Sequence, residues 1–334
     1  MSMSSEKNLI KLISGVMPKS PLQMNKLYES DSEIVDYKGS KLLFNIDEFS
    51  KEDMFREHNP RILGFNIATA SISDILATGG TPLYYLHSMC VPSRWDENYI
   101  KSFSQGVAEA LRLNNMTFLG GDFSKSEEWK YTATVVGENN NKCILRSGAK
   151  IGDNIYITGK IGTGNLEAFL KIKGINKFKL MFNSRHKESR FINSYATACI
   201  DTSDGCYNCL NTIAEMSNVG YEIEKVPYIR LGKIAAKLAN VEELLLFLGE
   251  CGEYELMFTI AEGEEENFIK NAKKNGFRFY RIGKIVETGT KIIRDSKRII
   301  DFSNINISAR DYENIEDYLQ ELIRVIKRDD TYGK

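Results

Sequence analysis

The segment between residues 60 and 80 constrains the fold most, because it predicts one long helix built almost entirely from small and apolar residues. Pro60 stands where a first helical turn accepts proline, and Gly79-Gly80 follow the expected end. Apolar side chains recur three and four positions apart, as one helix face requires, at Ile62, Phe65, Ile72, Ile75 and Leu76. The only acidic residue in this run is Asp74, so the fold must accommodate a carboxylate within a mostly apolar helix.

Asp74 has no cation within reach on its own helix. On a helix surface a residue pairs with those three and four positions away, which here are Ala70, Ser71, Ala77 and Thr78. Because Asp is seldom buried without a partner, its partner must come from elsewhere, or Asp74 is a solvated residue on an outer face. Both interpretations stay open at this point.

Acidic residues also stand at strand ends and in glycine-containing turns elsewhere, at Asp31, Asp47, Asp122, Asp201 and Asp204. Each alone is typical of a turn, because the Asp side chain hydrogen-bonds to its own backbone. Gathered in one cleft together with Asp74, these carboxylates would repel one another unless cations lay among them. Oxygen ligands in that number suit Mg²⁺, which bridges protein carboxylates and nucleotide phosphates. The pattern therefore favours a magnesium–nucleotide site.

The order of the predicted elements indicates a mixed α/β chain with two domains. Strand patterns and helical spacing alternate in the first part of the chain, at 41–47, 98–115 and 130–138. After Arg146 the signals restart with a strand, a glycine turn and a helix over 154–169. We therefore place a boundary near residue 145, which separates an N-terminal domain 1–145 from a C-terminal domain 146–334.

The C-terminal half continues with further predicted elements. Short apolar runs predict strands at 195–200, 243–249 and 253–260. The turn after the first of these strands opens a helix that Ser203 or Asp204 can cap. A charged amphipathic segment predicts a surface helix over 313–328.

The glycine-rich turn at 159–165 lies where a strand leads into a helix. Backbone N–H groups in such a turn form a ready anion site. The segment lacks the Lys-Ser/Thr ending of a Walker loop and the last glycine of a dinucleotide fingerprint. We therefore interpret it as a tight strand-to-helix connection.

Composition excludes several classes of partner. Lys plus Arg number 44 and Asp plus Glu number 45, a balance that provides no long-range field to attract nucleic acid or an anionic membrane. No segment approaches the roughly 18 uninterrupted apolar residues of a membrane span, and the N-terminal apolar run is too short for a signal peptide. We expect a cytoplasmic protein with no nucleic-acid or membrane partner.

The six cysteines are scattered except for the Cys206-x-x-Cys209 pair. A zinc site needs two further ligands at a matching spacing, which the sequence does not offer. We expect reduced thiols, with a redox pair as the alternative interpretation.

Several ordered motifs resemble one family. They are ESD with Asp31, NID with Asp47, SISDILATGGTP with Asp74, LGGD with Asp122, RSGAKIGD with Arg146, IDTSDG with Asp201, Ser203 and Asp204, and GECGEYEL at 249–256. In order and spacing the chain resembles the thiamine-monophosphate kinases, from about residue 28 to about residue 260. This family belongs to a superfamily with aminoimidazole ribonucleotide synthetase, selenophosphate synthetase and a hydrogenase maturation protein.

The resemblance implies a two-domain architecture of the aminoimidazole ribonucleotide synthetase type. The N-terminal α/β domain, 1–145, would bind Mg-ATP and pair its sheet across a homodimer. The C-terminal α/β domain, 146–334, would cover the cleft for the nucleotide and a small-molecule phosphate acceptor.

The resemblance also implies site residues. The implied Mg²⁺ ligands are Asp31, Asp47, Asp74, Asp122, Asp201 and Asp204. The implied ATP contacts are Gly121, Asp122, Arg146 and Ser203. Asp204 and Arg146 would act in catalysis, which in phosphoryl transfer is mostly positioning and charge neutralisation.

The chain departs from the family pattern mainly at residues that would contact the acceptor. Met54 replaces a histidine that contacts thiamine phosphate, and Gly252 replaces a glutamate that contacts the substrate. Ser30 and Phe123 replace an aspartate and a threonine, and the family's C-terminal Gly-aromatic-x-His-Phe signature is missing. The candidate substitutes for the acceptor contacts are Glu250, Glu253, His58 and Tyr312.

Three functions remain open from the sequence. The first is a Mg-ATP phosphotransferase that acts on thiamine monophosphate or a related small metabolite. The second is an ATP-dependent ligase or cyclase, although residues 1–28 lack the glycine-rich, lysine-bearing segment expected for it. The third is a nucleotide-binding protein without turnover.

Overall fold

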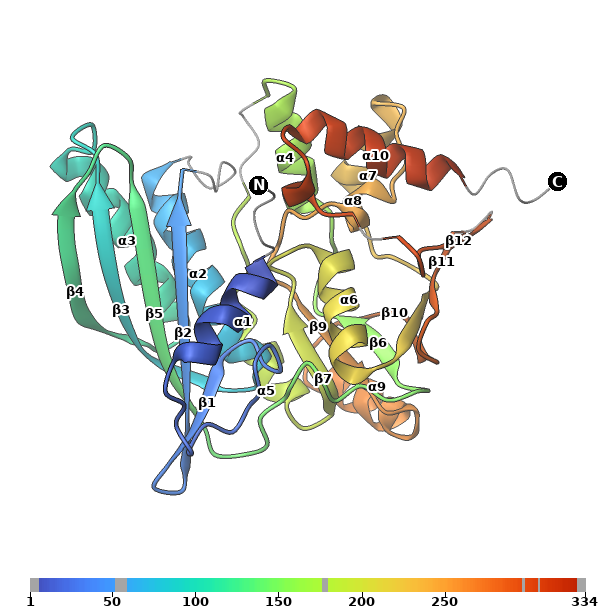
Figure 1. The fold of residues 1–334 in the computed structure, drawn as a ribbon, viewed down its shortest axis with the longest axis horizontal. Coiled ribbons are helices and arrows are strands. Elements are labelled where there is room, and N and C mark those ends of the chain that lie inside the picture. The colour runs from blue at the N-terminus through green and yellow to red at the C-terminus, as the bar shows by residue number, and fades with distance from the viewer. Residues whose placement is uncertain (1–5, 52–58, 176–179, 296–297, 306, 329–334) are drawn as a thin grey trace.

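The computed structural model describes residues 6–51, 59–175, 180–295, 298–305 and 307–328. Two β-sheets lie side by side across the molecule, with helices packed around them (Figure 1). This architecture confirms the predicted mixed α/β class. Within these ranges, no helix combines the length and the apolar character needed to cross a membrane.

The first sheet has five strands in the order β1-β2-β5-β3-β4. Their bounds are Glu33–Tyr37 (β1), Ser40–Ser50 (β2), Thr81–Val91 (β3), Thr117–Lys125 (β4) and Lys130–Asn139 (β5). β3 and β4 are parallel, and the other neighbours are antiparallel. The predicted strands at 41–47 and 130–138 are β2 and β5.

Helices cover one face of this sheet. α2 (Pro60–Ala77) and α3 (Glu97–Leu113) pack against it, and β5 contributes Tyr131, Ala133 and Val135 to the core beneath them. The residues between these three point to the other face, because successive side chains of a strand alternate. Among the residues that the structure describes, no helix covers the other face of the sheet (Figure 1).

α2 is the helix predicted from the segment 60–80. Every residue from Leu63 to Ala77 is buried except Asp74, because the helix contacts the first sheet, α3 and the second sheet. Glycines allow α2 and α3 to approach closely. A Cβ on Gly64 would lie 2.1 Å from the Phe103 carbonyl oxygen.

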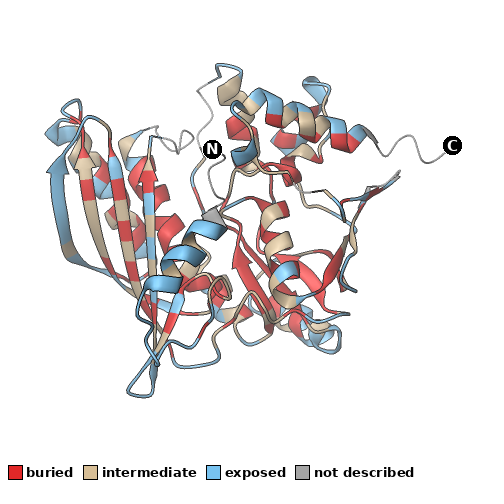
Figure 2. Ribbon diagram, viewed as in Figure 1, coloured by how far each residue is buried: buried red, intermediate tan, exposed pale blue. Residues whose placement is uncertain are grey.

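The second sheet has seven strands in the order β12-β11-β8-β10-β6-β9-β7. Their bounds are Asn154–Ile157 (β6), Ala196–Asp201 (β7), Gly220–Ile223 (β8), Leu256–Ile260 (β9), Tyr280–Val286 (β10), Lys291–Asp295 (β11) and Arg298–Asp301 (β12). Two interior strands, β6 and β9, are buried along their whole length (Figure 2).

The remaining helices are mostly those of the C-terminal half. They are α1 (Glu6–Val16), α4 (Thr163–Ile172), α5 (His186–Ile192), α6 (Cys206–Ser217), α7 (Arg230–Leu238), α8 (Leu245–Leu248), α9 (Glu265–Lys274) and α10 (Ile315–Arg328). α4, α7, α8 and α10 gather at one end of the second sheet (Figure 1). α10 is the tail helix predicted over 313–328.

Two local predictions were wrong. The segment 243–249 contains the short helix α8 and no strand, because a short apolar run that is buried on all sides carries no period that separates strand from helix. Neither Ser203 nor Asp204 is the N-cap residue of α6. The N-cap residue is Gly205, which makes no side-chain cap, and the Ser203 hydroxyl donates to Asp201.

Candidate active site

Three of the predicted acidic residues converge where the two sheets meet. Asp31 precedes β1, Asp74 lies in the last turns of α2, and Asp201 ends β7. One carboxylate oxygen from each lies within 4.8 Å of one from each of the others. Three like charges this close repel strongly, so each depends on neighbouring donors or on a cation.

Arg146 is the cation beside this cluster. Its Nη2 donates to Asp31 Oδ1 at 2.6 Å in a pair that is largely buried. Burial raises the pKa of Asp31, and the charge of Arg146 only partly opposes this effect. The guanidinium stays charged, because the neighbouring carboxylates outweigh the effect of its burial and raise its pKa. The buried Nε of Arg146 has no hydrogen-bond partner within the described residues.

Asp74 is half-buried at the edge of a cleft, so it is not a solvated residue on an outer face. Asn45 from β2 donates through Nδ2 to Asp74 Oδ2 at 2.7 Å and to Asp47 Oδ2 at 2.9 Å. Burial raises the pKa of Asp74 well above its usual range, and the charges of Asp47, Asp201 and Asp31 add to this effect. The hydrogen-bond partner of Asp74 that the sequence left unidentified is thus the Asn45 amide, and other carboxylates surround it.

Asp201 is fully buried and is held by two hydroxyl groups. Ser73 Oγ donates to Asp201 Oδ2 at 2.6 Å, and Ser203 Oγ donates to Asp201 Oδ1 at 2.8 Å. Burial and the charge of Asp31 raise the pKa of Asp201 to about 7, although both hydroxyl groups lower it. A bound cation would therefore stabilise the ionised form of this carboxylate.

A polar cleft of about 440 Å³ opens beside the cluster. Four residues of the predicted set line it, namely Asp47, Asp74, Ser203 and Asp204. Residues that the sequence did not single out also line it, among them Asn66, Phe182, Tyr254 and Arg310. Only Tyr254 lay within a recognised motif, and nothing local marks the others.

Gly121 and Asp122 lie apart from this cleft. They stand on β4, the edge strand, and Asp122 is exposed. Asp122 pairs across the sheet with Ser88, whereas Asp47 shares a row with Ala133 and His87. Adjacent rows of a sheet point to opposite faces, so Asp47 and Asp122 project from opposite faces of one protomer.

The predicted acceptor contacts are distributed differently. Met54 and His58 lie outside the described residues. Gly252 packs against the turn that carries Ser203, where a Cβ would lie 2.0 Å from the Ser203 carbonyl oxygen. Glu250 lines the cleft, and burial raises the pKa of its carboxyl group.

Glu253 and Tyr312 do not line the cleft. Glu253 is buried and accepts hydrogen bonds from Gly162 N and Gly164 N. Tyr312 lies against Tyr318, with the ring centroids 5.9 Å apart. None of the six cysteines, all of which lie in the described ranges, forms a disulfide, and Cys206 and Cys209 are buried in the first turn of α6.

The donor set fits a hard divalent cation. It offers carboxylate oxygens from separate elements, and their raised pKa values indicate excess negative charge. The two hydroxyl groups and the Asn45 amide orient these oxygens as outer partners of metal ligands do. Such a cleft can hold a polyphosphate through cations.

The comparisons with known proteins agree with this chemistry. Residues 29–139 match the family model described as "AIR synthase related protein, N-terminal domain". The thiamine-monophosphate kinase of Aquifex aeolicus is 30% identical over 290 residues, which are 82% of this chain and 91% of that protein. The thiamine-monophosphate kinase of Bacillus subtilis is 32% identical over 266 residues, which are 74% of this chain and 81% of that protein.

Solved structures share the fold. The thiamine monophosphate kinase of Aquifex aeolicus has a TM-score of 0.67 and 25% identity, with 87% of this chain and 98% of that chain covered. AaThiL complexed with AMPPCP and TMP has a TM-score of 0.73 and 26% identity, with 89% of this chain and 96% of that chain covered. A HypE–HypF complex, at 16% identity and a TM-score of 0.70, shares the fold alone, with 86% of this chain and 95% of that chain covered.

Proposed function

Because the chain belongs to the thiamine-monophosphate kinase family, we infer that it is an ATP-dependent kinase that phosphorylates thiamine monophosphate. A phosphate oxygen of thiamine monophosphate attacks the γ-phosphorus of ATP, and the bond to the bridging oxygen breaks. The products are thiamine diphosphate and ADP. The observation that carries this inference is the convergence of Asp31, Asp74 and Asp201 beside a polar cleft. The relatives' activity does not favour the ligase or cyclase alternative.

Mg²⁺ is the metal that this proposal requires. We propose that Asp31, Asp74 and Asp201 hold it, with Asp47 and Asp204 as further ligands from the cleft wall. When bound, Mg²⁺ neutralises the charge of the phosphates during transfer.

The chain's own residues position these groups. Asn45 fixes Asp47 and Asp74 relative to each other, and Ser73 fixes Asp201. Arg146 orients Asp31, and its unpaired Nε can donate to an oxygen of the nucleotide. No side-chain nucleophile is needed, because the acceptor phosphate supplies the attacking oxygen.

We further propose that two protomers form the active enzyme. Apolar side chains on the open face of the first sheet support this, because Phe44 is 37%, Ile46 is 69% and Tyr84 is 42% exposed. A second sheet packed on this face would cover them. Asp122 projects from that same face. We therefore propose that Gly121 and Asp122 contact ATP bound to the partner protomer, and that Asp122 also serves as a metal ligand there.

The two domains keep their proposed roles. Residues 1–145 include the five-stranded sheet, α2 and Asp31, Asp47 and Asp74. Residues 146–334 include Arg146, Asp201, Ser203 and Asp204, and they close the cleft from the other side. We propose that the first domain binds Mg-ATP and forms the dimer, and that the second covers the nucleotide and acceptor.

The direct test measures thiamine diphosphate by chromatography after incubation with ATP, Mg²⁺ and thiamine monophosphate. We expect the wild-type protein to form it, and Asp74→Asn to form it at least about a hundredfold more slowly, because a metal ligand is lost. Asp317→Asn, an exposed position on α10, is the matched control and should keep full activity.

Two results would contradict the proposal. If the wild-type protein transfers phosphate from ATP, or hydrolyses ATP, only in the presence of another metabolite, then thiamine monophosphate is not its acceptor. Equal rates for Asp74→Asn and the wild type would contradict the proposal that Asp74 holds a metal needed for the reaction.

A further inference from the structure

The wall of the polar cleft carries one basic side chain. Among the described residues that line the cleft, Arg310 is the only lysine, arginine or histidine. The acidic residues of the same wall are Asp47, Glu48, Asp74, Glu167, Asp204 and Glu250. A phosphate monoester carries a charge of roughly −1.5 to −2 near pH 7, so these carboxylates repel it. An acceptor that bears a phosphate group therefore needs a cation on this wall.

Arg310 stands in a turn that is fixed on both sides. This turn is the 3₁₀ helix η2 (Ala309–Asp311), which comes shortly before α10. Ala309 and Tyr312 are partly buried and pack against the core of the second sheet, whereas Arg310 is exposed and lines the cleft. The apolar neighbours thus fix the backbone and leave the guanidinium at the cleft wall.

Glu250 joins this turn to the loop at 249–252. Its Oε1 accepts a hydrogen bond from Ala309 N at 2.9 Å. Its carboxylate also accepts hydrogen bonds from the side chains of Asn208 and Ser308. The carboxylate is therefore engaged with the chain itself, and it holds the residue next to Arg310 against the cleft wall.

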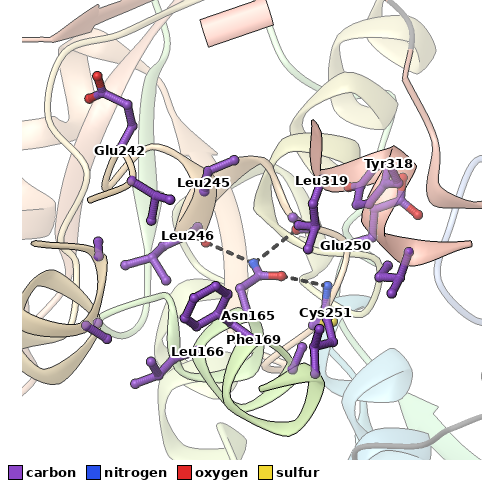
Figure 3. Close-up of a pocket in the computed structure, with 18 of the residues that line it drawn as sticks. Asn165, Leu166, Phe169, Glu242, Leu245, Leu246, Glu250, Cys251, Tyr318 and Leu319 are labelled. Atoms are coloured by element: carbon purple, nitrogen blue, oxygen red, sulfur yellow. Dashed lines mark hydrogen bonds between the residues drawn. The ribbon is translucent and has the colours of Figure 1, made fainter. Parts of the chain in front are cut away.

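The loop that carries Glu250 is itself fixed. Asn165 Nδ2 donates to the carbonyl oxygens of Leu246 and Gly249 at 2.9 and 3.1 Å, and Asn165 Oδ1 accepts from Cys251 N at 3.1 Å. The loop also lines a second, apolar pocket, in which Figure 3 shows these bonds. A chain of hydrogen bonds thus runs from α4 through the loop to η2.

Arg310 is separate from the cation of the acidic cluster. Arg146 Nη2 donates to Asp31 Oδ1 at 2.6 Å, whereas Arg310 comes from the turn held by Glu250. In an in-line transfer the acceptor phosphate lies on the far side of the γ-phosphorus from ADP, so it needs a cation apart from the nucleotide site. A guanidinium suits this group, because its planar fork donates two parallel hydrogen bonds to phosphate oxygens.

We propose that Arg310 binds the phosphate group of the acceptor and makes the enzyme select a phosphate monoester over the unphosphorylated alcohol. This inference rests on the proposed function. Two of the three terminal phosphate oxygens accept hydrogen bonds from the guanidinium, and the third stays free to attack the γ-phosphorus of ATP. Glu250 is the positioning residue of Arg310.

Steady-state rates of thiamine diphosphate formation, with ATP and thiamine monophosphate varied separately, test this proposal. Arg310→Gln should raise the KM for thiamine monophosphate about ten- to a hundredfold and leave the KM for ATP unchanged, because a charge-assisted contact to the acceptor is lost. Arg310→Lys keeps the charge without the planar fork and should give an intermediate KM. Arg112→Gln, exposed at the end of α3, is the matched control and should behave as the wild type does.

Thiamine separates a phosphate contact from a general disturbance of the cleft, because it lacks the phosphate group. Its inhibition constant, measured against thiamine monophosphate, should not rise in Arg310→Gln.

Variants of Glu250 test the positioning role. Glu250→Ala removes the acceptor of Ala309 N and should also raise the KM for thiamine monophosphate. Adding Arg310→Gln to Glu250→Ala should then raise this KM little beyond the value for Arg310→Gln alone, because the two residues act as a unit. Glu250→Gln keeps an oxygen acceptor and should stay close to the wild type.

Three results would overturn this inference and leave the proposed function intact. The first is an unchanged KM of Arg310→Gln for thiamine monophosphate. The second is a KM for ATP that rises instead, which would assign Arg310 to the nucleotide. The third is an inhibition constant of thiamine that rises by the same factor. A wild-type protein that forms no thiamine diphosphate would contradict the proposed function itself, and this inference with it.

Discussion

At the scale of single residues, Glu253 explains the glycine turn before α4. Its carboxylate accepts hydrogen bonds from Gly162 N and Gly164 N, which would otherwise be free to bind an anion. Burial raises the pKa of Glu253 to about 8, although these hydrogen bonds lower it. The turn is a strand-to-helix connection, as its sequence predicted, and Glu253 is an internal acceptor that the sequence did not predict.

This carboxylate makes stability depend on pH. The pKa of Glu253 in the folded state lies above its usual value of 4.5, so its stabilising contribution is complete below pH 4.5 and is lost as the pH rises towards 8. Glu253→Gln keeps an oxygen acceptor but does not ionise. Between about pH 5 and about pH 8, we expect the wild type to lose on the order of 3 kcal/mol more unfolding free energy than this variant.

Urea denaturation at both pH values measures this difference. Glu127→Gln removes an exposed carboxylate instead and should follow the wild type. Parallel losses in wild type and Glu253→Gln would show that Glu253 is ionised without cost in the folded protein.

At the scale of elements, glycines let the loop at 249–252 pack closely against the turn at 201–205. The loop at 249–252 touches the turn at 201–205, and a Cβ on Gly252 would lie 2.0 Å from the Ser203 carbonyl oxygen. Gly205 has φ of 79° and faces the Gly249 carbonyl oxygen, so it also excludes a side chain. The position of Asp201 and Asp204 therefore depends on backbone contact.

Gly252→Ala should displace the turn that carries Asp201 and Asp204. We expect ATP affinity in the presence of Mg²⁺ to fall between about tenfold and a hundredfold, because catalytic groups tolerate little displacement. Isothermal titration with a non-hydrolysable ATP analogue measures the affinity.

Gly263→Ala is the matched control for this substitution. A Cβ at Gly263 meets no atom within 4 Å, so this variant should bind as the wild type does. A Gly252→Ala protein with unchanged affinity would mean that the loop moves without disturbing the acidic cluster.

At the scale of the whole molecule, the open face of the first sheet remains to be covered. Its row through Phe44, Val136 and Tyr84 carries apolar side chains outward, and Ile46, two residues further along β2, points the same way. A sheet with one apolar face uncovered is expected to find a partner surface.

Ile46→Lys should convert the protein from a dimer into a monomer, because a charge would be buried in the interface. Light scattering after size-exclusion chromatography gives the mass of each species. Leu238→Lys places the same charge on α7, at a side chain that is 83% exposed, and should remain dimeric. A monomeric wild-type protein, or a dimeric Ile46→Lys variant, would reject this interface.

Local pattern alone determined much of this protein. Helical spacing with Pro60 and Gly79 defined α2, and alternation defined β5, because side-chain period and backbone dihedral angles are linked within a few residues. The ordered aspartate motifs indicated the family. Local pattern did not identify the helix in segment 243–249, because a mostly buried apolar run has no polar face to reveal its period.

Only the tertiary structure decided which aspartates meet. Asp31, Asp74 and Asp201 come from a loop, a helix and a strand end, and their meeting depends on how α2 packs between the two sheets. The same packing turned Asp122 away from Asp47. Such contacts join residues far apart in the chain, and no local period encodes the distance between them.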